Sequence, residues 1–573
     1  MSRFAMFVAA LSAALIAGAL LILEPISRPG TSSAPRGPVG WQPAGDPGPF
    51  PSAGPIQPRF VDISTLPLAS EDPILDTLVP RGDGGPDMPI SEAEAGILRQ
   101  QALNLPPQAR VQHIETLGPG LAAPAIDRSF DSINFDDGGS GVPPDPEMAV
   151  GPNHVIATVN SIIEIYDRDG NTLVGPVQSD SFFAGTPGCA GTFDPNVLYD
   201  EKEDRFFIGY DSGTGPGSDN GYCMAVTQTN DPTAGWNLYS FDASFNPGDF
   251  FDYPHAGVGD EAIFMGANIF GGTFHADVWA IDKFAMYAGA PLPMPVRHQL
   301  DETGNSPDTP QPMNAHGFLN GTWPEGNLHY ILAECFFNGT DMCIYRWEDP
   351  FGADLFTLVG SVDLNTETGV VGGFPLDQPQ DGATLLAGND FRPQDAEYRN
   401  GTITMTQTIA CNPGGGPVNC VRWATIDPVT ATFVDGGVIG TDGDYRSFPD
   451  AAVNDCGDLT LGYTKTNTTM FPGVYFTGRL ATDPPGTVQP EALLQAGEVA
   501  YTSFQGTGDA NRWGDYTGAT SDFDGGLTWY LGQYSRNNTA STKWGNTIGA
   551  FDSGCVPTIG LGEIFFVDGF ESS

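Results

Sequence analysis

The chain has 573 residues and a formal net charge of −47 at neutral pH, because 70 acidic side chains face only 23 Lys and Arg. This shortage of cations argues against nucleic acid and against anionic membrane surfaces as partners, since both are bound through clustered Lys and Arg. Gly and Pro number 74 and 50, and aromatic residues make up 11% of the chain. That mixture favours many short strands joined by turns, so we expect an all-β protein.

The N-terminus has the pattern of an export segment. Arg3 precedes a run over 4–23 that is apolar apart from Ser12 and Gly18. The run suits either a cleaved signal peptide or an uncleaved signal anchor over residues 1–26. We expect a secreted or outer cell-surface protein with no membrane contact apart from this segment.

Residues 27–125 form the next region, which is rich in Pro and Gly and is interpreted as a flexible tether. Within it, Ser91-Glu92-Ala93-Glu94 has the pattern of a helix start. This leaves open a short helix over 91–104 or no ordered element. The folded body is expected over 126–555, followed by a tail over 556–573.

A repeated motif within the body carries the fold prediction. Each copy combines Asp, an aromatic residue or Pro with a following alternating strand, an Asp-Gly turn and a return strand. The copies lie at Pro144-Asp145-Pro146, Asp194-Pro195, Asp252-Tyr253-Pro254, Met313-Asn314-Ala315-His316, Asp390-Phe391-Arg392-Pro393, Asp444 to Pro449 and Arg512 to Tyr516. Seven copies predict a β-propeller of seven four-stranded antiparallel blades, with six blades as the alternative.

The last copy ends in a hairpin that resembles the Asp-box of sialidase-type propellers. Its residues are Asp522, Asp524, Gly526, Thr528 and Trp529, with Asp where the motif usually has Ser or Thr. In such folds the box is a structural turn remote from the catalytic centre. The resemblance therefore implies architecture and not a reaction.

About three quarters of the chain resembles an uncharacterised family of secreted bacterial β-propeller proteins. The segments that carry this resemblance are 144–146, 150–154, 252–258, 282–291, 462–463, 475–480 and 512–516. The family implies the fold and no activity. Separately, the tail over 564–571 resembles a short C-terminal motif of exported proteins in some gammaproteobacteria, which implies a sorting signal.

Eight cysteines in an exported chain predict disulfides. Two pairs flank short turns, Cys335 with Cys343 and Cys411 with Cys420. Cys189 and Cys223 tie a long loop to the next strand. The two remaining cysteines, Cys456 and Cys555, then fasten the last blade to the one before it. Zinc is the alternative, but no CxxC spacing or Cys/His cluster supports it.

Three arginines form the candidate ligand site. Arg392, Arg446 and Arg512 stand at corresponding places in three successive copies of the repeat. If they point into the central channel, three guanidinium groups can hold a carboxylate or sulfate. The favoured interpretation is that each pairs with a nearby acid (Asp390, Asp444 and Asp515) and joins the blades.

Other chemistry is sparse. His255 and His316 occupy similar places in successive repeats and are interpreted as unrelated histidines rather than as a facing pair. Segments 134–139 and 167–171 are rich in Asp and Gly but lack EF-hand spacing, so both are interpreted as plain turns. We therefore predict no metal site and no cofactor, and Ca²⁺ has no support beyond composition.

The functional prediction follows from a rigid scaffold with long loops and no assembled catalytic set. We expect a monomeric, non-catalytic propeller that binds an extracellular polymer or protein through its loop-rich face. The alternative is a sialidase-like hydrolase or lyase that acts on an acidic sugar at the three arginines. Whether the protein is an enzyme stays open, with the balance against it.

Overall fold

The computed structural model describes residues 49–558 except 72–87, 118–123, 139–140, 214–219, 245–248, 272, 301–306, 325, 383 and 503–509. The predicted export segment over 1–26 and the end of the tail beyond residue 558 lie outside the described residues. None of the described helices is long and apolar enough to cross a membrane.

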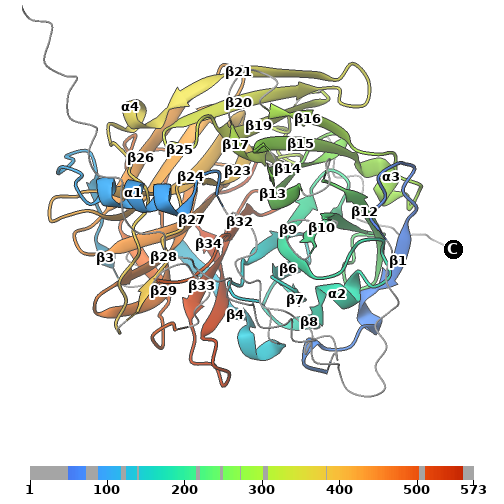
Figure 1. The fold of residues 1–573 in the computed structure, drawn as a ribbon, viewed down its shortest axis with the longest axis horizontal. Helices are drawn as coiled ribbons and strands as arrows, with labels where there is room; N and C mark the ends of the chain where they lie inside the picture. Colours follow the sequence, from blue (N-terminus) through green and yellow to red (C-terminus); the bar gives the residue numbers. More distant parts are fainter. Residues whose placement is uncertain are drawn as a thin grey trace, which may run out of the picture. The chain divides into compact units, whose positions relative to one another are not determined.

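Seven sheets, each built on four antiparallel strands, form the blades of a propeller (Figure 1). The first strand of each blade contacts the first strand of the next, and the first strand of blade 7 contacts that of blade 1. These contacts close a seven-membered ring. They confirm the predicted seven-bladed propeller over the alternative of six blades.

The first four blades each take their strands from one continuous stretch of chain. Their strands are, for blade 1, β5 (Glu147–Val150), β6 (His154–Val159), β7 (Ile162–Asp167) and β8 (Thr172–Gln178); for blade 2, β9 (Thr192–Asp200), β10 (Arg205–Ser212), β11 (Gly221–Thr227) and β12 (Gly235–Asp242); for blade 3, β13 (Phe250–Val258), β14 (Ala262–Phe270), β15 (His275–Asp282) and β16 (Val296–Gln299); and for blade 4, β17 (Asp308–Pro312), β19 (Leu328–Glu334), β20 (Asp341–Glu348) and β21 (Leu355–Asp363).

Blades 5 and 6 follow the same plan, whereas blade 7 is composite. Their strands are, for blade 5, β23 (Pro393–Arg399), β24 (Thr402–Cys411), β25 (Val418–Asp427) and β26 (Thr432–Gly440); for blade 6, β27 (Tyr445–Val453), β28 (Leu459–Asn467), β29 (Met470–Arg479) and β30 (Glu491–Gln495); and for blade 7, β32 (Gly518–Ser521), β33 (Thr528–Ser535), β34 (Trp544–Asp552) and β4 (Ala125–Asn134). Three short helices lie between strands, α2 (Ser179–Phe182), α3 (Lys283–Tyr287) and α4 (Leu364–Thr368).

The ring is closed inside blade 7 by strands from the two ends of the body. β4 pairs antiparallel with β34, from Asn134 opposite Gly545 to Ala125 opposite Asp552. The last copy of the repeat, at Arg512 to Tyr516, therefore supplies only three strands of its blade, and the fourth comes from the start of the body. The short turn between β4 and blade 1, η4 (Phe135–Asp137), begins with a capping box between Asn134 and Asp137.

An arm that precedes β4 runs along the outer edges of several blades, within the region expected to be a tether. Its strands add to outer strands: β1 (Arg59–Asp62) to β12, β2 (Gln112–His113) to β26, and β3 (Thr116–Leu117) to β30. Two short turns, η1 (Ile63–Thr65) and η2 (Ala69–Glu71), lie against β8. In Figure 1 these early elements lie beside strands from far along the chain.

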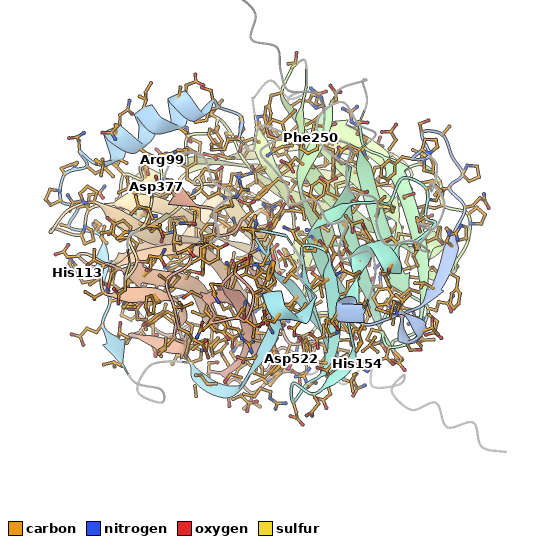
Figure 2. All side chains as sticks on the ribbon, turned by 60° about the horizontal axis from the view of Figure 1, so that its bottom comes forward. Arg99, His113, His154, Phe250, Asp377 and Asp522 are labelled. Carbon is orange, nitrogen blue, oxygen red and sulfur yellow. A yellow bond between two sulfur atoms is a disulfide. The ribbon has the colours of Figure 1, made fainter. Side chains whose placement is uncertain are left out.

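Helix α1 (Glu92–Ala102) belongs to this arm and begins at the cap that the sequence indicated. The Ser91 side chain accepts from the Glu94 backbone N–H, and the Glu94 carboxylate accepts from the Ser91 N–H. Its buried Ala95 packs in one cluster with Phe374, Phe391 and Ile409 of the region around blade 5. Arg99 lies 3.9 Å from the Asp377 carboxylate, and Figure 2 labels both residues. Burial of this face explains an ordered helix in a Pro-rich arm.

The four disulfides are those that the sequence predicted. They join Cys189 to Cys223, Cys335 to Cys343, Cys411 to Cys420 and Cys456 to Cys555. Four disulfides are typical of a protein that folds in an oxidising compartment. The Asp-box-like hairpin also forms between β32 and β33, where the Gly525 N–H donates to Asp522 O and the Gly526 N–H donates to Asp524 Oδ1.

Candidate functional site

The first strand of each blade carries an irregularity that shapes the central channel. The irregularity is marked by one residue with a positive φ in each of six blades, namely Asp145, Asp194, Tyr253, Thr309, Asp395 and Phe448. All but Asp395 are followed by Pro, and in blades 2 to 6 the strand register shifts at this point. A bulge leaves its extra residue without a ladder partner, so Pro, which has no N–H to donate, is tolerated there.

These bulges are the physical basis of the repeat, and they correct its register in blades 4 and 5. The sequence placed those copies at Met313 to His316 and at Asp390 to Pro393, but the bulges are at Thr309-Pro310 and at Asp395. Two residues after a bulge, side chains join neighbouring blades. Asn196 donates to the Pro254 carbonyl at 3.0 Å, and Gln311 donates to the Pro393 carbonyl at 3.0 Å.

We call the side of the ring where the first strands begin the loop side, and the side where they end the turn side. Between the two sides lies a cavity of about 20 Å³, room for one or two water molecules. Its polar lining is contributed by several blades and comprises Glu147, Asn196, His255, Asn314 and Asp395. Because these residues belong to different blades, the cavity lies in the central channel.

Carboxyl groups dominate the charge of this cavity. Burial and the neighbouring Glu397 raise the pKa of Asp395 to about 8. Burial and the charge of Asp395 raise the pKa of Glu147 well above its usual range, and the same causes raise the pKa of Asp450. By contrast, burial and then Arg392 lower the pKa of His255 to about 3, so its imidazole is neutral.

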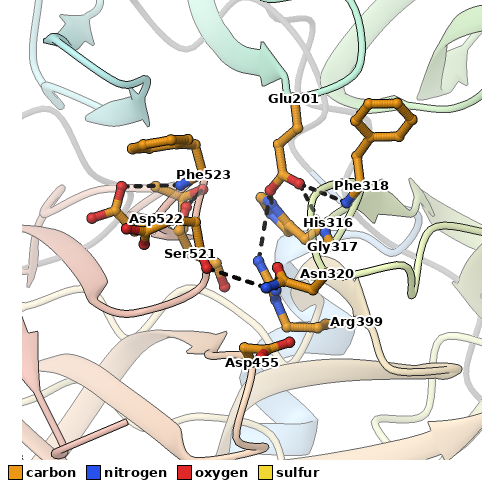
Figure 3. Close-up of polar contacts among 12 residues, drawn as sticks. Glu201, His316, Gly317, Phe318, Asn320, Arg399, Asp455, Ser521, Asp522 and Phe523 are labelled. Atoms are coloured by element: carbon orange, nitrogen blue, oxygen red, sulfur yellow. Dashed lines mark hydrogen bonds and ion pairs between the residues drawn. The ribbon is translucent and has the colours of Figure 1, made fainter. Parts of the chain in front are cut away.

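On the turn side of the cavity, His316 bridges Glu201 and Glu397, and Figure 3 shows His316 beside Glu201. Its Nδ1 lies 2.8 Å from Glu201 Oε1 and its Nε2 lies 2.7 Å from Glu397 Oε2, and all three side chains are buried. Burial alone would lower the pKa of His316, but Glu397 and Glu201 raise it to about 9. The imidazolium is therefore the resting form at neutral pH.

Hydrogen bonds close the turn side below this bridge. Glu201 also accepts from the backbone N–H groups of Gly317 and Phe318, at 2.8 and 3.0 Å. Arg399 donates to Asn320 Oδ1 at 3.2 Å, and Asn320 donates to the carbonyls of Asp524 and Thr558 at 3.3 Å each. The β32–β33 turn and the end of the described chain thus cover the channel.

On the loop side, two tyrosines fill the channel. The rings of Tyr253 and Tyr516 stack at 4.7 Å, and the guanidinium of Arg392 lies 3.8 Å from the Tyr253 ring centre. The Tyr253 hydroxyl donates to the Asp515 carbonyl, and the Tyr516 hydroxyl donates to Asp194 Oδ2. The channel is therefore packed above the cavity as well as below it.

Each of the three candidate arginines has an acidic partner. Arg392 Nε lies 2.7 Å from Asp390 Oδ2, and Arg512 pairs with Asp515. Arg446 Nη2 lies 2.8 Å from Glu491 Oε1, a partner that the sequence did not indicate. The expected partner, Asp444, is farther away, at 3.9 Å.

Two of these arginines share the loop side of the channel. Asn389 connects them, because it accepts from Arg392 Nη2 at 3.4 Å and donates to Asp515 Oδ1 at 2.7 Å. Arg446 belongs to a separate buried cluster in blade 6, where Lys465 Nζ also lies 2.6 Å from Glu491.

The sequence analysis did not single out Glu147, Asn314 or Asp395. A usable signal existed, since Glu147 stands two residues after the bulge at Asp145, and Asp395 is itself a bulge residue. His255 and His316 were interpreted as unrelated, but both belong to the channel, one in the cavity and one directly below it. Among the described residues, no three His, Cys, Asp or Glu are placed to hold a metal ion.

Comparisons with known proteins are remote. No protein-family model matches the sequence, and no curated protein matches it. Among solved structures, the Hadza microbial sialidase Hz136 is 10% identical over 70% of this chain and 73% of its own, with a TM-score of 0.33. Trypanosoma rangeli sialidase with the inhibitor DANA is 8% identical over 67% of this chain and 56% of its own, with a TM-score of 0.31. An ulvan lyase of the polysaccharide lyase family PL25 is 11% identical over 62% of this chain and 79% of its own, with a TM-score of 0.33. Likeness at this level decides nothing about the site.

Proposed function

We propose that the protein is a non-catalytic extracellular propeller that binds a polymer or a protein through the loop side of its ring. The observation that carries this proposal is the filled channel. Stacked Tyr253 and Tyr516 lie above the cavity, the His316 bridge lies below it, and about 20 Å³ is left between them. A sugar ring needs several times that volume, so the cavity between these residues has no room for one.

Two long connections build a surface on the loop side. The chain between α4 and β23 and the chain between β30 and β32 pair through short parallel strands, β22 (Leu385–Leu386) and β31 (Ala510–Asn511). Gln380 Nε2 donates to the Tyr501 carbonyl at 2.7 Å, which joins the same two connections. Loops held in this way on a rigid scaffold are the usual place for binding residues.

The alternative, an enzyme that acts on an acidic sugar, has less support from this geometry. Arg392 and Arg446 are both buried and paired with carboxylates, and the channel cavity is lined by further carboxyl groups. An anionic sugar would have to displace these carboxylates while it faces their negative charge. Arg512, whose side chain is 20% exposed, is the most accessible of the three, and it too is paired.

The test is a binding array of polysaccharides and surface proteins, read beside assays for hydrolysis and elimination on acidic sugars. Leu385, which is 39% exposed on the loop side, is replaced by Asp, and binding is expected to weaken about tenfold. The matched control is Val429→Asp, since Val429 is 61% exposed in the β25–β26 turn on the turn side. Turnover of any acidic sugar, or equal binding by the two variants, would contradict the proposal.

A further inference from the structure

The channel cavity contains polar atoms that lack partners among the described residues. Asn314 Oδ1 and His255 Nε2 make no hydrogen bond there, although these residues are only 5% and 6% exposed. Asn314 and His255 line the cavity directly. Buried polar atoms are normally paired, and leaving them unpaired is costly, so these atoms indicate a bound group.

The charge around the cavity calls for a cation. Glu147, Asp395 and Asp450 come from blades 1, 5 and 6. The charge of Asp395 raises the pKa of both other carboxyls, and the charge of Glu147 raises the pKa of Asp450. A fourth carboxylate, Glu397, is already bonded to His316.

The positive groups nearby are held by other acids. His316 is shared between Glu201 and Glu397, Arg399 lies 3.6 Å from Glu201, and Arg392 is paired with Asp390. None of these ion pairs includes Glu147 or Asp395, although the charge of His316 acts to lower the pKa of Asp395.

Size and geometry select the kind of cation. A metal ion such as Ca²⁺ needs oxygen ligands converging within about 2.6 Å, and no described group of three His, Cys, Asp or Glu is placed for that. A primary ammonium group is about the size of a water molecule and donates three hydrogen bonds over about 2.7–3.2 Å. The cavity of about 20 Å³ has room for such a group.

A glycine in blade 7 preserves the position of one carboxylate. A Cβ on Gly518 would lie 2.8 Å from the Met148 backbone nitrogen and 3.1 Å from Glu147 Oε2. Both contacts are tighter than ordinary packing allows, so a side chain there would push Glu147 away. Glu147 and Asp395 keep part of their surface exposed, in contrast to the fully buried Asp450.

From these observations we infer that the cavity between the Tyr253–Tyr516 stack and the His316 bridge is a binding site for a single primary ammonium group. Glu147 and Asp395 supply the counter-charge, and Asn314 Oδ1 accepts one of its hydrogen bonds. The site is distinct from the loop-side surface and does not depend on it, so binding at either place can fail without the other.

Binding at this site is coupled to proton release. The carboxyl of Asp395, whose pKa burial and Glu397 raise to about 8, must ionise to receive a cation. Below about pH 8, the apparent affinity is therefore expected to fall about tenfold per pH unit for each proton displaced. Near neutral pH, about one proton should be released per ammonium bound.

The experiment uses the full-length, oxidised protein with methylammonium chloride as the probe and tetramethylammonium chloride at equal ionic strength as its control. We expect methylammonium to raise the melting temperature in a saturable way, more strongly near pH 8 than near pH 6, with proton release measured in weakly buffered solution. Tetramethylammonium has no N–H donor and should give no such shift. Equal shifts from the two salts, or a stronger shift from calcium chloride, would overturn the inference.

Variants locate the effect. Asp395→Asn and Glu147→Gln should each remove the rise in melting temperature that methylammonium causes. Two variants are used so that the test still stands if one of them fails to fold. Glu164→Gln is the matched control, because Glu164 is also a buried carboxyl with a raised pKa but bonds Tyr166 and Thr172 outside the cavity. It should keep the shift. A shift retained in both cavity variants would overturn the assignment.

Discussion

Removal of the Cys456–Cys555 disulfide is the perturbation whose size can be worked out most directly. The bond joins the turn after β27 to the chain that follows β34, across a sequence separation of 99. The disulfide stabilises the fold by restricting the unfolded chain. For a loop of about 100 residues, the chain-entropy relation gives a stabilisation of about 4.7 kcal/mol at 25 °C.

Other contacts at this point survive loss of the disulfide, so the folded state should persist without it. Ser553 Oγ lies 2.8 Å from Asn454 Nδ2 and donates to Asp458 Oδ2 at 2.7 Å. The Thr558 N–H donates to Asp455 Oδ2 at 2.7 Å, and β34 remains paired with β33 and β4. With an unfolding entropy of about 1 kcal/mol/K for roughly 500 ordered residues, the melting temperature should fall by about 4–5 °C.

The assay is scanning calorimetry of the Cys456→Ser/Cys555→Ser protein beside a matched Cys335→Ser/Cys343→Ser protein. The second pair has a sequence separation of only 8. The same relation gives it about 2.5 kcal/mol and a shift of about 2–3 °C. Reductant should abolish the difference between wild type and both variants. If the short-loop variant loses as much as the long-loop variant, the entropic reasoning is refuted.

Three further predictions concern the channel and the seam of the ring. Burial and a neighbouring carboxylate raise the folded-state pKa of Asp395 to about 8. The protonated carboxyl therefore contributes its full stability below about pH 4. As the pH rises from there to about 8, the free energy of unfolding should fall by up to about 1.4 kcal/mol per pH unit. Asp395→Asn should flatten this slope in urea unfolding and be more stable than wild type near pH 8, and an unchanged slope would contradict the assignment. His316→Gln removes the imidazolium that Glu201 and Glu397 share and should cost about 3–5 kcal/mol at neutral pH. Because the pKa of His316 is raised to about 9, the loss should shrink as the pH rises through about 9, and a pH-independent loss would argue against the imidazolium. Arg168 of blade 1 pairs with Asp522 of blade 7, so Arg168→Ala should lower the free energy of unfolding by about 2 kcal/mol. Amide hydrogen exchange should become faster in β4 and β34 but not in blade 4. An equal increase in exchange in all blades would contradict a role at the seam.

Much of the fold was predictable because its signals are local. The hairpin at Asp522 to Trp529 depends on Asp side chains that bond backbone N–H groups a few residues away, and on Gly at positive φ. The helix start at Ser91 depends on a capping box of four residues. The disulfide pairs at Cys335 and Cys411 each span one short turn. Such features need no knowledge of distant chain.

The site was not predictable to the same degree. The three arginines were recognised as corresponding positions, but in a chain with 70 acidic side chains the partner of each depends on packing and not on sequence distance. Arg446 takes Glu491, which is 45 residues away in the chain. The sequence could not show that Asp395 and Glu147 belong to one site, because they come from blades 5 and 1 and meet only across the channel.

The sequence by itself predicted seven blades and the cysteine pairs, and it determined the acidic character of the chain, because each follows from turn chemistry, spacing or composition. The tertiary structure alone decided that β4 completes blade 7, that the preceding arm lies on the outer edges of blades 2, 5 and 6, and that the channel is filled. These features arise when the ring closes. Strand edges and buried charges separated by hundreds of residues then become neighbours, and each must find a partner that no local pattern specifies.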